Sequence, residues 1–74
     1  KGLDIIIALD TSKSMLAEDI KPNRLERAKY EITHFIDKLR EDRVGLICFA
    51  GTSFVQCPLT LDYSAAKIFL KIID

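Results

Sequence analysis

The sequence predicts an α/β fold with the element order β-α-β-β-α. Apolar runs typical of buried strands alternate with segments in which apolar residues recur every three or four positions, as on one face of a helix. The first helical segment stands between two apolar runs, and such a strand-helix-strand unit is nearly always a right-handed crossover between parallel strands. The third apolar run follows the second after a short turn, so we expect it to be antiparallel.

The composition limits both the size and the class of the protein. The chain has 74 residues, so it forms one domain at most. Hydrophobic residues make up 49% and charged residues 30%, as in globular rather than disordered chains. The 11 Lys and Arg residues equal the 11 Asp and Glu residues, and this zero net charge argues against a nucleic-acid partner. No apolar run approaches the roughly 18 residues of a membrane span.

The first strand is predicted at 3–9 and the first helix after it. Residues 3–9 are apolar at nearly every position and rich in isoleucine, which predicts a strand buried on both faces. A polar loop occupies 10–22. Asn23 is a good N-cap with Glu26 three residues later, and the helical pattern that begins there runs to about Arg40.

A hairpin and a last helix complete the predicted elements. The second buried strand is predicted at 43–50 and a short third strand at 53–59, joined by a turn at 51–52. Pro58 either ends the third strand or confines it to the sheet edge, because proline cannot donate a ladder hydrogen bond. The last helix begins after Asp62, an N-cap residue, and carries more apolar surface than three strands can cover.

The loop after the first strand holds the side chains that are best suited to bind a ligand. Asp10 stands at the carboxyl end of a parallel strand, where open α/β sheets bind ligands. Alternation puts Asp10, Ser12 and Ser14 on one side of the chain and leaves Thr11 and Lys13 pointing elsewhere. One carboxylate and two hydroxyls suit Mg²⁺, Mn²⁺ or Ca²⁺ rather than Zn²⁺. The alternative is a polar loop in which Asp and Ser only cap backbone amides.

Other polar and reactive side chains have simpler interpretations. Cys48 and Cys57 show neither a disulfide framework nor a metal-ligand spacing, so we expect small buried hydrophobic residues. The acidic pair at 18–19 is expected to be solvated, and His34 is expected at the helix surface. We also expect the Lys67 and Lys71 stripe to be a solvated helix face.

The segment DTSKS (10–14) resembles the Asp-x-Ser-x-Ser signature of the metal-ion-dependent adhesion site in von Willebrand factor type A (vWA) domains. With NRLERAK at 23–29 and VGLICFAG…CPLTLDY at 44–63 in register, nearly the whole chain is similar to vWA domains of the bacterial aerotolerance (Bat) type. The resemblance implies a Rossmann-like, doubly wound three-layer sandwich, of which residues 1–74 would be a single partial domain, the N-terminal half. It also implies a divalent cation beneath a protein-binding surface and no catalysis.

The resemblance assigns metal-ligand roles residue by residue to Asp10, Ser12 and Ser14. In the family a Thr and a second Asp from later loops complete the site. Thr60 is a weaker candidate, because it precedes the last helix whereas the family's Thr follows it, and because helix capping explains Thr60. With three ligands, the chain is expected to bind Mg²⁺, Mn²⁺ or Ca²⁺ weakly, at roughly millimolar strength.

The family also suggests partners and a location. It implies a protein partner, either a MoxR-type ATPase or another vWA protein, and a parent protein anchored in the bacterial membrane with its vWA domain in the periplasm or the cytoplasm. The chain itself is expected to be soluble. If the parent sheet continues beyond the first strand, that strand is an open apolar edge here, so we expect a homo-oligomer through it.

Two alternative functions stay open. The loop could be part of a metal-independent structural scaffold. Asp10 also stands where phosphoaspartyl hydrolases keep their nucleophile, although those enzymes need a second Asp two residues on, and Ser12 occupies that position.

Overall fold

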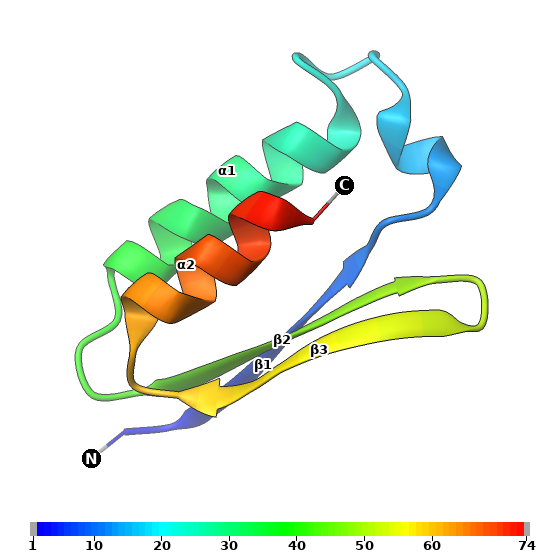
Figure 1. The fold of residues 1–74 in the computed structure, drawn as a ribbon. Coiled ribbons are helices and arrows are strands. Elements are labelled where there is room, and N and C mark those ends of the chain that lie inside the picture. The colour runs from blue at the N-terminus through cyan, green and yellow to red at the C-terminus, as the bar shows by residue number, and fades with distance from the viewer. Residues whose placement is uncertain (1, 74) are drawn as a thin grey trace.

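The structure, a computed structural model, describes residues 2–73 and has the predicted β-α-β-β-α order (Figure 1). One element was not predicted: a short 3₁₀ helix, η1, in the loop after the first strand. The elements are β1 (Asp4–Asp10), η1 (Lys13–Leu16), α1 (Arg24–Asp37), β2 (Arg43–Ala50), β3 (Ser53–Thr60) and α2 (Tyr63–Ile72).

The three strands form one mixed sheet in the order β1-β2-β3. β1 runs parallel to β2, and Asp10 at its end lies opposite Phe49. β3 runs antiparallel to β2, with an irregularity in the ladder between Val44 and Leu46. β3 is therefore an edge strand, and it continues past Pro58 to Thr60, so Pro58 marks the sheet edge and does not end the strand.

Both helices cover the same face of the sheet (Figure 1). Side chains from β1, β2, α1 and α2 meet there and form the core, because the apolar stripe of each helix needs the sheet to exclude water from it. The buried core residues are Leu9, Leu25, Ile36, Leu39, Val44, Leu46, Cys48, Ala66 and Leu70.

The prediction that the first strand is buried on both faces is wrong for the described residues. Burial in β1 alternates along the strand, and Ile6 is 50% exposed. The reason is that α1 and α2 cover one face only, so alternate side chains face outward. Phe49 and Phe54, which lie opposite each other in the hairpin, are also exposed.

Local capping fixes where both helices begin. The Asn23 side chain accepts a hydrogen bond from the Glu26 backbone N–H at 2.8 Å, and Asp62 accepts one from Ala65 N–H at 3.1 Å. Both predicted N-caps are confirmed. α1 ends at Asp37, before the predicted end near residue 40, although the buried Leu39 still belongs to the core.

Candidate functional site

The structure brings Asp10, Ser12 and Ser14 together at the carboxyl end of β1. Asp10 is the last residue of β1, and its Oδ1 accepts a hydrogen bond from the Ser12 backbone N–H at 2.8 Å. The Ser12 and Ser14 hydroxyl oxygens lie 3.0 Å apart. The three oxygen-bearing side chains therefore form one cluster, in the alternating arrangement that the sequence predicts.

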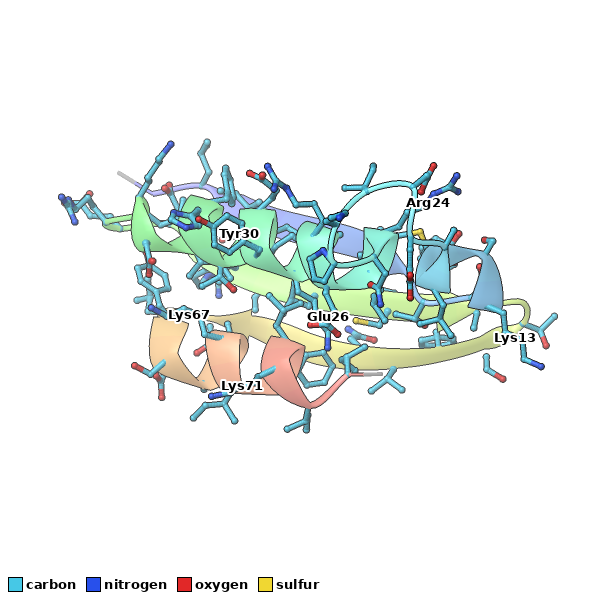
Figure 2. All side chains as sticks on the ribbon, turned by 90° about the horizontal axis from the view of Figure 1, so that it is seen from above. Lys13, Arg24, Glu26, Tyr30, Lys67 and Lys71 are labelled. Atoms are coloured by element: carbon cyan, nitrogen blue, oxygen red, sulfur yellow. The ribbon has the colours of Figure 1, made fainter. Side chains whose placement is uncertain are left out.

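Thr11 turns the other way and anchors the loop to the sheet. Its backbone N–H donates to the Phe49 carbonyl at 2.7 Å, and its hydroxyl donates to the same carbonyl at 3.0 Å. Lys13 is exposed, and Figure 2 shows it at the end of the molecule beyond the helices. The ammonium group of Lys13 is thus in solvent, where its positive charge would interfere least with a metal ion bound by the loop.

The helix η1 sets the position of Ser14 relative to Ser12. Met15 N–H donates to the Ser12 carbonyl at 2.9 Å, which closes a 3₁₀ turn around Ser14. Ser12 is the N-cap residue of η1, yet its side chain makes no capping hydrogen bond. The capping alternative accounts for Asp10, which accepts from the Ser12 amide, and the Ser12 and Ser14 hydroxyls hydrogen-bond to each other at 3.0 Å.

Hydrogen bonds hold Asp10 in its charged form. The backbone N–H of Ser12 is the main cause that lowers the pKa of Asp10, and the Ser12 side chain lowers the pKa further. Partial desolvation acts in the opposite direction but is weaker. The carboxylate is therefore ionised at neutral pH, as a metal ligand must be.

The donor set fits a small hard cation. Two ligand oxygens on adjacent corners of a Mg²⁺ octahedron lie about 3 Å apart, given metal–oxygen distances of about 2.1 Å. The Ser12 and Ser14 hydroxyl oxygens, which share a hydrogen bond, lie 3.0 Å apart and so are already close to that separation. Within residues 2–73 no three His, Cys, Asp or Glu side chains cluster in a way that could hold a metal. The donors that cluster at the end of β1 are the Asp10 carboxylate and the two serine hydroxyls.

Thr60 lies away from this loop. It pairs with Val44 near the start of β2, whereas Asp10 pairs with Phe49 near its end. These β2 positions are separated by about 16 Å at the usual rise per strand residue. The Thr60 hydroxyl accepts a hydrogen bond from the Asp62 backbone N–H at 2.9 Å, which is the capping role that the sequence suggests.

The remaining polar side chains behave as the sequence indicates, with one addition. Asp19 is exposed and forms an ion pair with Arg24 at 2.7 Å. His34 is exposed at the helix surface. Cys48 and Cys57 are free thiols; Cys48 is buried as expected, and burial raises its pKa, whereas Cys57 on the edge strand β3 is only half-buried.

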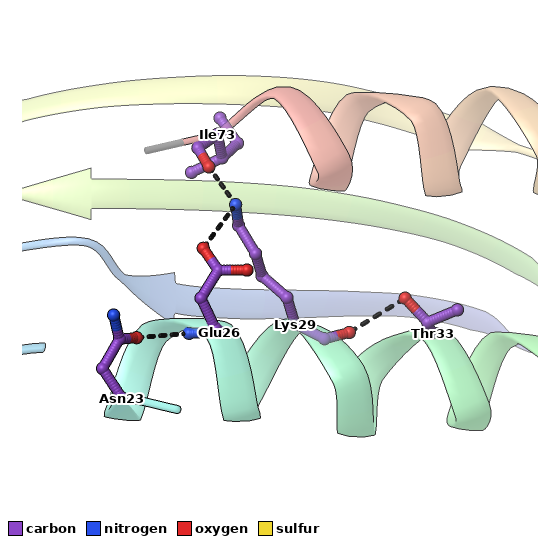
Figure 3. Close-up of polar contacts among 5 residues, drawn as sticks. All are labelled: Asn23, Glu26, Lys29, Thr33 and Ile73. Carbon is purple, nitrogen blue, oxygen red and sulfur yellow. Dashed lines mark hydrogen bonds and ion pairs between the residues drawn. The ribbon is translucent and has the colours of Figure 1, made fainter. Parts of the chain in front are cut away.

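Lys29 is a residue whose role sequence reasoning missed. It is only 9% exposed, and its ammonium group donates to the Ile73 carbonyl at the end of α2 and contacts Glu26 at 3.4 Å (Figure 3). The three-residue spacing from Glu26 is the only local signal of this role. The contact with Ile73 depends on the tertiary fold, so no local pattern predicts it.

Comparison with known proteins identifies the family. The model of the von Willebrand factor type A domain matches residues 5–74. The chain belongs to the vWA domain family. The family recognised in the sequence is thereby confirmed.

Two solved structures share this vWA fold and much of the sequence. One is a conserved hypothetical protein, BatB, of Bacteroides thetaiotaomicron, with 50% identity and a TM-score of 0.94 over 99% of this chain and 36% of that chain. The other is an aerotolerance-related membrane protein of Bacteroides fragilis that carries multiple mutations to serine, with 47% identity and a TM-score of 0.93 over the same shares. The resemblance to Bat-type vWA domains is confirmed.

The vWA chain spans only part of the relatives that it matches. A UPF0353 protein of Mycolicibacterium paratuberculosis is 37% identical over 71 residues, which are 95% of this chain but 22% of that protein. The B. fragilis relative is described as a membrane protein. Among the helices that the structure describes here, none is long and apolar enough to cross a membrane.

Proposed function

We propose that this vWA chain is a non-catalytic protein-interaction module that binds a divalent cation through Asp10, Ser12 and Ser14. The observation that supports the proposal is the pair of Ser12 and Ser14 hydroxyls 3.0 Å apart, beside the charged Asp10, at the end of β1. The cation is Mg²⁺, with Mn²⁺ or Ca²⁺ as substitutes, because all the donors are hard oxygens.

The charge of the loop suggests how the cation would serve recognition. Asp10 is the only carboxylate in the donor set, so a bound divalent ion keeps net positive charge. Such an ion acts as an acceptor for a carboxylate from another protein. The residues of this chain hold and orient the ion, and the partner completes its coordination.

The family and the relatives support a bacterial membrane setting for the parent protein. Bat-type relatives include an aerotolerance-related membrane protein. We propose a MoxR-type ATPase or another vWA protein as the partner, with the domain on either the periplasmic or the cytoplasmic side. The described part of β1 pairs only with β2, so its other edge could pair with a second copy of the chain.

The hydrolase alternative requires an acid that the loop does not offer next to Asp10. Ser12 holds the position of the second Asp, and the Ser12 backbone N–H already bonds to Asp10. Phosphatase turnover that disappears in Asp10→Asn would favour this alternative. The scaffold alternative would gain if binding to a partner were unchanged by EDTA.

Manganese binding followed by NMR tests the proposal. Mn²⁺ is paramagnetic and broadens signals near its site, so the amides of Ser12 and Ser14 should broaden first, with a dissociation constant of roughly millimolar size. Asp10→Asn keeps the shape of the side chain but removes its charge, and it should weaken binding at least about tenfold.

Glu18→Gln is the matched control, because Glu18 is an exposed carboxylate in the same loop. This variant should bind Mn²⁺ as tightly as the chain without substitutions. Equal binding by Asp10→Asn and the parent chain would contradict the metal role of the loop and would favour the scaffold.

A further inference from the structure

We propose that the groove between α1 and α2 is a second interaction surface, which docks an acidic peptide segment of a partner protein around one apolar anchor residue. The groove has a volume of about 790 Å³. Figure 2 looks down on it and shows the two helices side by side. Asp10, Ser12 and Ser14 do not line it, so the inference does not rest on the metal loop.

Positive charge is concentrated in the groove. Lys21 and Arg27 line it from the α1 side, Lys67 and Lys71 line it from α2, and Lys29 lies between them. Glu26 is the one acidic residue among the lining residues. Because the whole chain has zero net charge, this excess is a local feature of one surface.

Two of these cations are available for a ligand. Arg27 pairs with Glu31, Lys67 with Asp37, and Lys29 with Glu26. Lys21 and Lys71 form no ion pair within residues 2–73, and both are exposed. They belong to opposite walls of the groove, so carboxylates on the two sides of a bound segment could each meet one of them.

Tyr30 offers a surface for an apolar residue in the same groove. Its ring lines the groove and is 56% exposed. The ring is held by its neighbours on α1, with the Arg27 guanidinium 5.7 Å from its centre and the His34 ring at 4.4 Å. An exposed aromatic ring that neighbours hold in place loses little side-chain freedom when a ligand covers it.

The shape and charge favour a peptide over other polyanions. A groove accepts a chain with projecting side chains, whereas membrane-surface binding uses a protruding apolar face with basic residues around it. Nucleic-acid binding normally comes with a basic domain, and this chain is neutral. Carboxylates on either side of an apolar residue suit a groove that is lined by Lys21, Tyr30 and Lys71.

Fluorescence anisotropy with a labelled peptide, in which glutamates flank a central leucine, tests the inference. Lys21→Glu combined with Lys71→Glu should weaken binding at least about tenfold, because the attraction becomes repulsion on both walls. The matched control combines Lys13→Glu with Lys38→Glu, two exposed lysines outside the groove, and has the same net charge. The control should bind within about twofold of the parent chain, since remote surface charges are screened at physiological salt.

Further measurements in the same experiment distinguish peptide binding in the groove from binding at the metal loop and from an effect of unfolding. Tyr30→Ala should weaken binding of the leucine peptide more than binding of the same peptide with serine in place of leucine. Circular dichroism verifies that each variant is folded; if the Glu double variant is not, Lys21→Gln with Lys71→Gln replaces it and should still weaken binding. EDTA should leave binding unchanged, whereas binding at the metal loop would be lost.

Three results would overturn the inference. The first is equal loss of binding in the groove and control variants, which would show only a response to net charge. The second is stronger groove-dependent binding of phosphatidylglycerol vesicles or of a DNA duplex than of the peptide. The third is absence of peptide binding by the parent chain at low salt.

Discussion

The ammonium group of Lys29 joins the two helices of this chain. It lies almost out of solvent and binds the carbonyl of Ile73, where α2 ends. A cation at a helix C-terminus interacts favourably with the helix dipole and with carbonyls that have no partner inside the helix. Glu26, at 3.4 Å, offsets part of the cost of burying the charge.

Lys29→Ala is expected to destabilise the protein by about 1–3 kcal/mol, because it removes a charge-assisted hydrogen bond and the packing of the aliphatic stem. Lys29→Met keeps most of the packing and should lose less. Urea unfolding measures both free energies, with the exposed Lys38→Ala as the control. Equal stability of Lys29→Ala and Lys38→Ala would show that the contact with Ile73 contributes nothing.

Protonation of the Asp10 carboxyl group would set the lower pH limit for metal binding by the loop. Its pKa lies below the ordinary value of 3.8, first because of the Ser12 backbone N–H. A lowered pKa in the folded state gives stability that is present above the unfolded pKa and is lost as the pH falls through the folded pKa.

Metal binding by the loop should therefore stay constant from neutral pH down to about pH 5 and disappear only as the pH falls through the Asp10 pKa. Carbon-13 NMR of the Asp10 carboxyl gives that pKa directly. Ser12→Ala removes the smaller, side-chain contribution and should raise the midpoint slightly. A midpoint above the ordinary value in the parent chain would mean that the hydrogen bond does not form in solution.

Sequence reasoning succeeded for single residues when their partners are close in the chain. Asn23 and Asp62 cap helices through residues three positions away, and Ser12 and Ser14 meet two positions apart. It failed for Lys29, whose main partner is 44 positions away along the chain. Local geometry fixes the first kind of contact, whereas the second requires the helices to be packed.

At the level of elements, the beginning of α1 is encoded locally. Asn23→Ala should cost about 1 kcal/mol of stability, because the Glu26 backbone N–H loses its acceptor. Asn23→Asp and Asn23→Ser keep an acceptor oxygen and should retain most of the stability. Thermal unfolding of the three variants measures this order, and a loss of equal size in all three would contradict a capping role.

The elements that sequence reasoning placed wrongly depend on their surroundings. The burial of β1 could not be read from its isoleucines, because an apolar run does not say how many helices cover the sheet. η1 is a single turn within a polar loop, too short for any periodicity to reveal. The position of the loop that holds Asp10, Ser12 and Ser14 was predicted correctly, since the end of a parallel strand fixes it.

On the scale of the whole molecule, within the described residues, one sheet face has no covering element and the outer edges of β1 and β3 have no strand partner. On the uncovered face, Ile6 of β1 is 50% exposed and Phe54 of β3 is 65% exposed. Phe35 on α1 and Ile5 and Ile7 on β1 line a second, smaller groove beside the β1 edge. Together these features support pairing of two copies along β1.

The chain is therefore expected to associate in a concentration-dependent way at tens of micromolar, as measured by analytical ultracentrifugation. Ile6→Lys places a charge on the open strand and should shift the equilibrium towards the monomer, because charged residues on edge strands oppose pairing. Leu61→Lys is the control, since Leu61 is exposed but lies between β3 and α2. A monomeric parent chain over the whole concentration range would contradict edge pairing.

The two hydrogen bonds from Thr11 to the Phe49 carbonyl have a thermodynamic consequence for the loop. They attach the first loop residue to the neighbouring strand, so most of the entropy of ordering this segment is lost during folding rather than during binding. A cation that binds as proposed would then meet oxygens that are already in place. Each further ligand that a partner contributes would therefore add to the affinity for the ion with little entropic penalty from the loop. Because the chain alone would bind the ion weakly, the ion would bind tightly only in the complex with the partner.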